Sequence, residues 1–212
     1  MQLDVRNLAA IRGEERIFSG ITFSLAAGEA LLVTGRNGSG KSTLIRTIAG
    51  LLPQDEGEVN VTVAARAVPR AAEACHYLGH RNAMKRELTV EENLGFWKSF
   101  MGDFEGGHGL APEEAAGALG LPTLLHLPFG YLSAGQQRRM AMAKLLTVWR
   151  PIWLLDEPTA ALDVQSEEVF AGLMQAHLAK GGIIVVATHQ ELGLKNVRGL
   201  VMKGFEYAEG LL

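Results

Sequence analysis

The chain has 212 residues, of which 48% are hydrophobic, so it can bury the core of one compact domain. Its formal net charge of −3 gives no general basic field for nucleic acid. The single cysteine, Cys75, excludes an internal disulfide and fits a reducing compartment. Residues 1–6 lack the pattern of a secretion signal and no apolar run is as long as a membrane span, so we expect membrane contact only through partner proteins.

The hydrophobic pattern predicts strands first and then one helix. In chain order we expect two β-rich stretches, a short buried strand, a helix that ends at Gly50 and another strand, over residues 2–8, 16–24, 30–34, 42–49 and 58–64. The end of the chain returns to an α/β alternation, with apolar strands over 152–155 and 183–187 and a helix near 165–179 between them.

Residues 81–135 differ from the rest, because their helical segments are broken by Gly and Pro and contain no long apolar strand. A capping box, Thr89-Val90-Glu91-Glu92, opens a helix toward Met101. The glycine-rich stretch 103–112 is expected to be an exposed connection. We therefore expect an inserted helical subdomain over about residues 81–135.

Residues 35–43 fit G-x-x-x-x-G-K-[ST], the phosphate-binding loop of nucleotide hydrolases, and they lie between a predicted strand and a predicted helix. Glycines let successive N–H groups point at one anion, Lys41 supplies a cation near the β- and γ-phosphates, and Ser42 offers a hydroxyl to Mg²⁺. A chance Gly-rich turn is the alternative. The candidate ATP-binding residues here are Gly35, Arg36, Asn37, Gly38, Ser39, Gly40, Lys41, Ser42 and Thr43.

An apolar strand ends in the two carboxylates Asp156 and Glu157. In phosphate-loop enzymes an Asp at such a strand end helps to hold Mg²⁺, and the next acid is placed to orient or deprotonate the attacking water. Two acids that merely end a strand are the alternative. The phosphate loop upstream favours the catalytic interpretation.

Residues 132–136, Leu-Ser-Ala-Gly-Gln, begin a predicted helix that continues to about Trp149. Ser133 and Gln136 form a capping-box pattern, so this could be only a well-capped helix. Its first turn, with little side-chain bulk, is equally an open anion site. The adjacent Arg138 and Arg139 are expected on a solvated helix face.

Together these elements resemble the ATP-binding cassette family over nearly the whole chain. Residues 132–136 are similar to its LSGGQ signature, with Ala134 in place of the first Gly; 160–163 look like its D-loop, and His189 matches its switch histidine. The resemblance implies an α/β fold: a phosphate-loop nucleotidase core with a mixed or parallel sheet flanked by helices, an antiparallel β subdomain and the inserted helical subdomain, in a single domain over 1–212.

The resemblance also implies an ATPase that uses ATP and Mg²⁺. Two copies would pair head to tail, with each ATP between one copy's phosphate loop and the other copy's signature helix. Asp163 would couple the two sites. The implied roles are catalysis by Lys41, Glu157 and His189, Mg²⁺ binding by Ser42 and Asp156, and contacts to ATP from Ser133, Gly135 and Gln136.

Two positions depart from the family pattern. Arg12 stands where an adenine-stacking aromatic is expected, and a guanidinium can stack on a base. His80 replaces the Gln that would join Mg²⁺ and the attacking water to the transporter interface; it could bind a metal-linked water or be a structural histidine. Cys75 and His76, next to this segment, are expected to be core residues rather than a haem or metal site.

Three runs narrow the resemblance to ATP-binding subunits of transporters that handle haem in cytochrome c maturation: residues 77–80, 132–139 and 187–192. This implies a homodimer docked on separate transmembrane subunits at the cytoplasmic face of the inner membrane, where ATP turnover drives release of a haem-loaded chaperone. Another exporter, of lipid or drug, and a soluble ATPase for metal-cluster assembly remain alternatives. The absence of coiled-coil arms and the acidic balance argue against a DNA-repair cassette.

Overall fold

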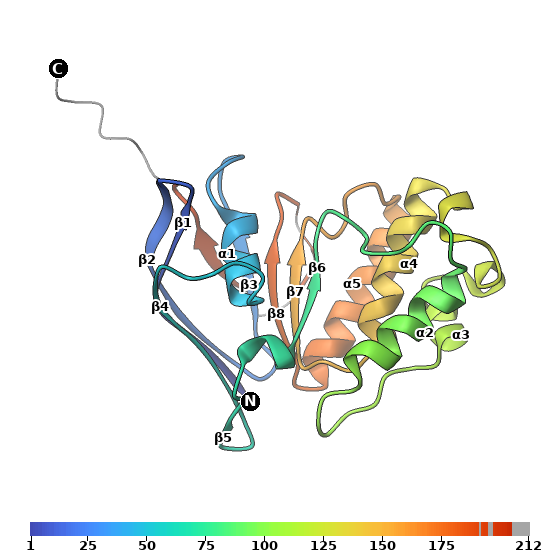
Figure 1. Ribbon diagram of the computed structural model, residues 1–212, viewed down its shortest axis with the longest axis horizontal. Helices are drawn as coiled ribbons and strands as arrows, with labels where there is room; N and C mark the ends of the chain where they lie inside the picture. Colours follow the sequence, from blue (N-terminus) through green and yellow to red (C-terminus); the bar gives the residue numbers. More distant parts are fainter. Residues whose placement is uncertain (191, 195–196, 205–212) are drawn as a thin grey trace.

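The computed structural model describes residues 1–190, 192–194 and 197–204, so Glu191 of the third run lies outside the described residues. A five-stranded parallel sheet forms the centre, in the order β6-β7-β8-β3-β9 (Figure 1). Its strands are β3 (Ala30–Thr34), β6 (Cys75–Leu78), β7 (Ile152–Asp156), β8 (Ile183–Ala187) and β9 (Val197–Val201). The buried strands predicted over 30–34, 152–155 and 183–187 are confirmed as β3, β7 and β8, whereas β9 was not predicted.

A second, antiparallel sheet has the order β2-β1-β4-β5 and forms the predicted antiparallel β subdomain. Its strands are β1 (Gln2–Arg12), β2 (Glu15–Ala26), β4 (Glu56–Val63) and β5 (Arg66–Ala67). β1 and β2 are longer than predicted because they pair as one hairpin from Gln2↔Ala26 to Arg12↔Glu15, a contact that local patterns do not reveal.

Helix α1 (Lys41–Ile48) lies between the two sheets (Figure 1). Its Leu44, Ile45 and Ile48 are fully buried in a core that both sheets share. The helix stops where predicted, because Gly50 adopts φ +68° and its N–H donates to the Thr47 carbonyl at 3.0 Å.

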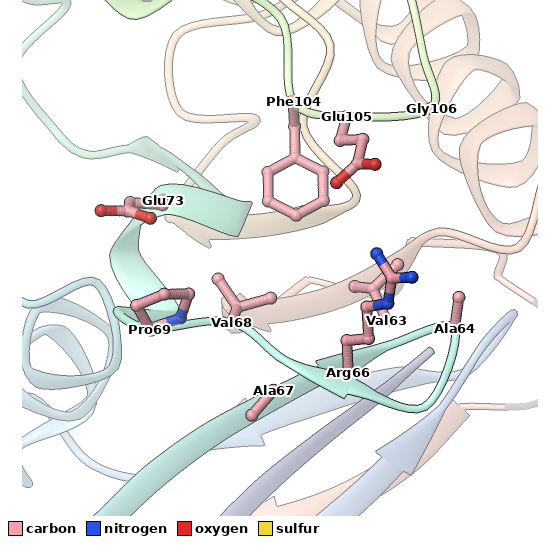
Figure 2. A pocket seen from close by; sticks show the side chains of 10 residues that line it. All are labelled: Val63, Ala64, Arg66, Ala67, Val68, Pro69, Glu73, Phe104, Glu105 and Gly106. Atoms are coloured by element: carbon pink, nitrogen blue, oxygen red, sulfur yellow. The ribbon is translucent and has the colours of Figure 1, made fainter.

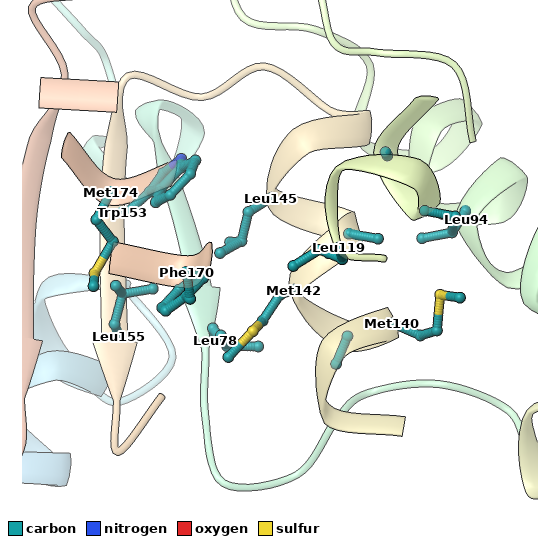
Figure 3. Close-up of a cluster of buried hydrophobic side chains, with 14 of the residues drawn as sticks. Leu78, Leu94, Leu119, Met140, Met142, Leu145, Trp153, Leu155, Phe170 and Met174 are labelled. Atoms are coloured by element: carbon teal, nitrogen blue, oxygen red, sulfur yellow. The ribbon is translucent and has the colours of Figure 1, made fainter. Parts of the chain in front are cut away.

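The opposite face of the parallel sheet packs against helices (Figures 1 and 3). α2 and α3 pack on α4, which borders β6. The cluster in Figure 3 joins Met140 and Met142 of α4 to Trp153 and Leu155 of β7 and Phe170 of α5. The elements on this side are α2 (Val90–Met101), α3 (Pro112–Ala118), η2 (Pro122–Leu124), η3 (Phe129–Tyr131), α4 (Ala134–Thr147) and α5 (Val164–Ala179); a short turn, η1 (Ala71–Ala74), precedes β6.

Strand β7 shows why its sequence is apolar without alternation. Ile152 and Leu154 face the α1 core, whereas Trp153 and Leu155 face the α4 and α5 core. A parallel strand covered on both faces needs apolar residues at every position. None of the helices in the described ranges combines the length and the apolar character needed to cross a lipid bilayer.

Candidate nucleotide-binding and hydrolysis site

The predicted phosphate loop connects β3 to α1 at the carboxyl edge of the parallel sheet. Gly35 has φ +140°, and a Cβ there would lie 2.3 Å from the Met202 carbonyl oxygen. Gly40 has φ +95° as the N-cap of α1, and a Cβ there would lie 2.7 Å from Ile17 Cγ2. Glycine is therefore required at both positions for conformation and space.

Lys41 is buried inside this loop. Its Nζ donates to the carbonyl oxygens of Gly35 at 2.7 Å and Arg36 at 3.1 Å. The ammonium is thus held against the backbone that would surround a triphosphate, close to the positive end of α1. Ser39 Oγ is also buried and has no hydrogen-bond partner among the described residues, which leaves the loop one spare hydroxyl.

Ser42 and Asp156 meet although 114 positions separate them. Ser42 Oγ donates to Asp156 Oδ1 at 2.8 Å, because α1 follows β3 and Asp156 ends β7 at the same edge of the sheet. One hydroxyl and one carboxylate, with phosphate and water supplying the remaining oxygens, fit the way proteins bind Mg²⁺. The described part of the chain contains no group of three or more His, Cys, Asp or Glu side chains that could hold a metal ion by themselves.

Glu157 and His189 face one another across the ends of β7 and β8, where Asp156 pairs with Ala187. His189 Nε2 lies 3.8 Å from Glu157 Oε1 and 3.2 Å from Asn37 Oδ1 of the phosphate loop. Three segments therefore converge on one point: the loop, the carboxylate after β7 and the imidazole after β8. A carboxylate here can accept a proton from water beside the phosphate loop.

Ser133 is exposed and caps α4. Its Oγ accepts from Gln136 N–H at 3.3 Å, and Gln136 Oε1 accepts from Ser133 N–H at 2.9 Å, so the predicted capping box is present. Gly135 lies against the D-loop, where an added Cβ would be 3.4 Å from the Ala161 oxygen. In the described part of the chain, no hydrogen bond or ion pair joins Ser133 or Gln136 to its own phosphate loop.

The two positions that depart from the family pattern are both exposed. Arg12 ends β1 opposite Glu15, in the hairpin whose second strand touches the phosphate loop through Ile17. His80 follows β6. Among the described residues, no hydrogen bond or ion pair joins either side chain to the loop, so their roles toward ATP stay predictions.

The prediction of a solvated face was wrong for Arg138, which is only 4% exposed. It donates to the carbonyls of Glu157 and Pro158 and to Gly79, so α4 places it against the candidate site. The sequence did contain a signal for this burial, because Arg138 lies four and seven positions before the buried Met142 and Leu145 and so shares their face of the helix.

His76 and Cys75 lie in the core, as expected. Burial lowers the pKa of His76 to about 3 and raises the pKa of Cys75 to about 12. His76 Nε2 is 2.7 Å from the Val148 carbonyl, so Nε2 carries the proton and donates it. Neither side chain is placed to ligate a metal at the candidate site.

The molecule also has a cavity of about 520 Å³ between the β4–β5 hairpin and the loop after α2 (Figure 2). In Figure 2, Arg66 from the hairpin side and Glu105 from the loop side point toward each other across it, with Phe104 beside Glu105 and Val68 on the hairpin side. Its lining segments lie at the amino edge of the parallel sheet, so it is separate from the phosphate loop at the carboxyl edge.

Comparison with known proteins agrees with this geometry. The family model described as ABC transporter matches residues 18–160. A protein named "Cytochrome c biogenesis ATP-binding export protein CcmA" from Rhizobium meliloti (strain 1021) is 60% identical over 205 residues, covering 97% of this chain and 99% of its own length. A protein of the same name from Agrobacterium fabrum is 59% identical over 210 residues, covering 99% of each.

Solved structures are similar over most of the chain. A Pyrococcus furiosus protein titled as a putative ABC transporter ATP-binding protein has a TM-score of 0.79, covers 95% of this chain and 98% of its own, and at 24% identity supports the fold alone. A dimeric ATP-binding cassette, MJ0796, in a post-hydrolysis state bound to ADP and Pi, has a TM-score of 0.73 at 25% identity and covers 89% and 88%.

Proposed function

This chain belongs to the ABC transporter family, and we propose on that premise that it is the ATP-hydrolysing subunit of an exporter that serves cytochrome c biogenesis. The hydrolytic part is carried by one observation: Lys41, the Ser42–Asp156 pair and the Glu157–His189 pair meet at one edge of the sheet. The export part is supported by near full-length similarity to proteins named as cytochrome c biogenesis export proteins.

In this mechanism the phosphate loop binds the triphosphate through its N–H groups, and Lys41 neutralises the β- and γ-phosphates. Ser42 and Asp156 would hold Mg²⁺, which supplies further positive charge to the phosphate oxygens. Glu157 accepts a proton from the attacking water at its carboxylate. His189 Nε2, already within reach of Asn37 and Glu157, donates toward the γ-phosphate.

The proposed working unit is a head-to-tail homodimer bound to separate transmembrane subunits at the cytoplasmic face of the membrane. Ser133, Gly135 and Gln136 would complete the partner copy's site. Support comes from the exposed end of α4, which has no bond to its own loop in the described residues, and from the dimeric structural relative. ATP turnover in this unit would drive release of a haem-loaded chaperone.

Glu157→Gln tests the hydrolytic part. We expect ATP hydrolysis to fall by at least about 10²-fold, because the proton acceptor is lost. ATP binding should persist, since Lys41, Ser42 and Asp156 are untouched, and ATP should then trap a dimer that light scattering detects. Glu168→Gln, on the exposed face of α5, is the matched control. Wild-type turnover in Glu157→Gln would remove Glu157 from the mechanism.

The export part is tested by complementation of a cell from which the gene for this protein has been deleted. The wild-type chain should restore covalent haem attachment to c-type cytochromes, whereas Glu157→Gln should not. Normal haem attachment in the deleted cell would overturn the export part while leaving the ATPase part intact.

A further inference from the structure

Arg138 joins three segments around Glu157. It lies in the second turn of α4 and is almost completely buried. Its Nε donates to the Pro158 oxygen at 2.9 Å, and its Nη2 donates to the Glu157 oxygen at 2.8 Å. Its Nη1 donates to the Gly79 oxygen at 2.7 Å and lies 3.3 Å from Asn82 Oδ1. Every nitrogen of the guanidinium is therefore hydrogen-bonded at this junction.

Arg138 also brings a buried positive charge to this junction. A guanidinium stays protonated in proteins, and here its hydrogen-bond acceptors are neutral carbonyl and amide oxygens. Burial lowers the pKa of Arg138, while the charge of Asp156 raises it. Asp156 is the carboxylate that pairs with Ser42, so the buried cation is coupled electrostatically to the candidate Mg²⁺ ligand.

The backbone of Glu157 needs support. Its φ is +46°, a left-handed conformation that is uncommon for a non-glycine residue and persists only where the surroundings hold it. The Glu157 N–H donates to the Ala187 oxygen of β8 at 2.8 Å, and its carbonyl accepts from Arg138. Both peptide groups beside its Cα are thus held, and together they set the direction of the carboxylate toward His189.

We propose that Arg138 is a positioning residue for ATP hydrolysis, which holds the Glu157 peptide so that the carboxylate faces His189 and links this orientation to α4. The inference rests on the proposed function, because it assumes that Glu157 is the general base. α4 begins at the candidate anion site of Ser133, and Gly79 directly precedes His80. A shift of either segment therefore changes the position of the general base through one side chain.

Arg138→Lys in the full chain is the test. The lysine keeps the positive charge but cannot form the planar fork that reaches the Glu157, Pro158 and Gly79 carbonyls together. We expect kcat for ATP hydrolysis to fall about 10- to 100-fold, the scale for a misplaced catalytic group. The KM for ATP should change by less than about threefold, because the phosphate loop is untouched.

Arg150→Lys is a closely matched control. Arg150 is also buried, and it donates to three backbone carbonyls, those of Met101, Gly102 and Trp149, at 2.6 to 2.8 Å. These bonds lie at the start of β7, at the opposite edge of the sheet from the site. Arg150→Lys should therefore lower the free energy of unfolding without changing kcat per nucleotide-binding molecule.

A double variant separates positioning from a general structural effect. In a Glu157→Gln background, Arg138→Lys should lower kcat by less than about twofold, because the group that it positions is already gone. If the double variant instead lost kcat by the product of the two separate reductions, the inference would be overturned. An Arg138→Lys chain whose kcat per nucleotide-binding molecule equals the wild type would also overturn it. If the lysine variant does not fold, Arg138→Gln, which can still donate to one carbonyl, takes its place in both measurements.

Discussion

Two buried histidines should make the fold sensitive to mild acid. Burial lowers the pKa of His76 from 6.5 to about 3 and that of His177 from 6.5 to about 4. His76 donates from Nε2 to the Val148 carbonyl, and its buried Nδ1 has no partner among the described residues. His177 stacks on Trp153 with ring centroids 4.1 Å apart. Neither ring can take up a second proton without a buried, poorly solvated charge.

The sign of the effect follows from proton linkage. Between pH 6.5 and about 4 the unfolded chain binds a proton on each of these histidines, whereas the folded chain does not, so the free energy of unfolding falls as the pH is lowered. From pH 7 to pH 5 the shifts correspond to roughly 2 kcal/mol for each histidine, or about 4 kcal/mol for both. That is a large part of the 5–15 kcal/mol typical of a domain.

Urea unfolding at several pH values measures this dependence. His76→Gln keeps a donor for the Val148 carbonyl but cannot titrate, so it should remove about half of the loss between pH 7 and pH 5. His177→Gln should remove the other half, and the double variant should be nearly independent of pH over this range. A wild-type pH dependence in the double variant would refute the reasoning.

Two further predictions concern the nucleotide. Lys41→Ala should weaken ATP binding at least about tenfold in a titration, because charge-assisted bonds to the phosphates are lost, and unchanged affinity and turnover would remove Lys41 from the site. GTP should compete with ATP to within about tenfold, since Arg12 in place of an aromatic gives little discrimination between purines; a strong preference for ATP in competition binding would show that another residue reads adenine.

The elements that the sequence predicted well are those with a strong local signal. Residues 152–155 and 183–187 are continuous apolar runs, and both form central strands. β9 has no such signal, because four of its five residues are exposed at the sheet edge, and the two-residue β5 is too short to show periodicity. Pairing across the chain, rather than local preference, creates both strands.

The features of the candidate site divide in the same way, into those with a local sequence signal and those set by contacts between distant segments. Lys41, Ser42, Asp156 and His189 were recognisable because their motifs are local and their order along the chain is informative. The φ of +46° at Glu157 could not be recognised from the sequence, because hydrogen bonds with β8 and α4 impose it. Sequence reasoning also could not see that Thr159 Oγ1 donates to Gln190 Oε1 at 2.5 Å and so joins the residue before the D-loop to the residue after His189.

The remaining prediction tests whether the site is shared between two copies. Ser133→Arg places a bulky cation at the exposed start of α4, where Ser133 has no hydrogen bond to its own phosphate loop among the described residues. If a partner's ATP binds there, hydrolysis should be lost while ATP binding to the monomer is retained, because Lys41 and Ser42 are intact. The substitution also removes the cap on Gln136 N–H, worth about 1 kcal/mol. Ser133→Ala removes the same cap without the bulk and should retain more activity.

Mixed dimers decide between a shared site and a site within one chain. Ser133→Arg and Lys41→Ala homodimers should both be inactive, since every site in them has one defective half. A heterodimer of the two variants contains one site with both defects and one built from the intact phosphate loop of the first chain and the intact signature helix of the second. Mixing the inactive chains in equal amounts should therefore restore turnover, to about a quarter of the wild-type value if the chains pair at random and the two sites act independently. In a site confined to one chain, mixing would restore nothing, and Ser133→Arg would weaken ATP binding to its own monomer.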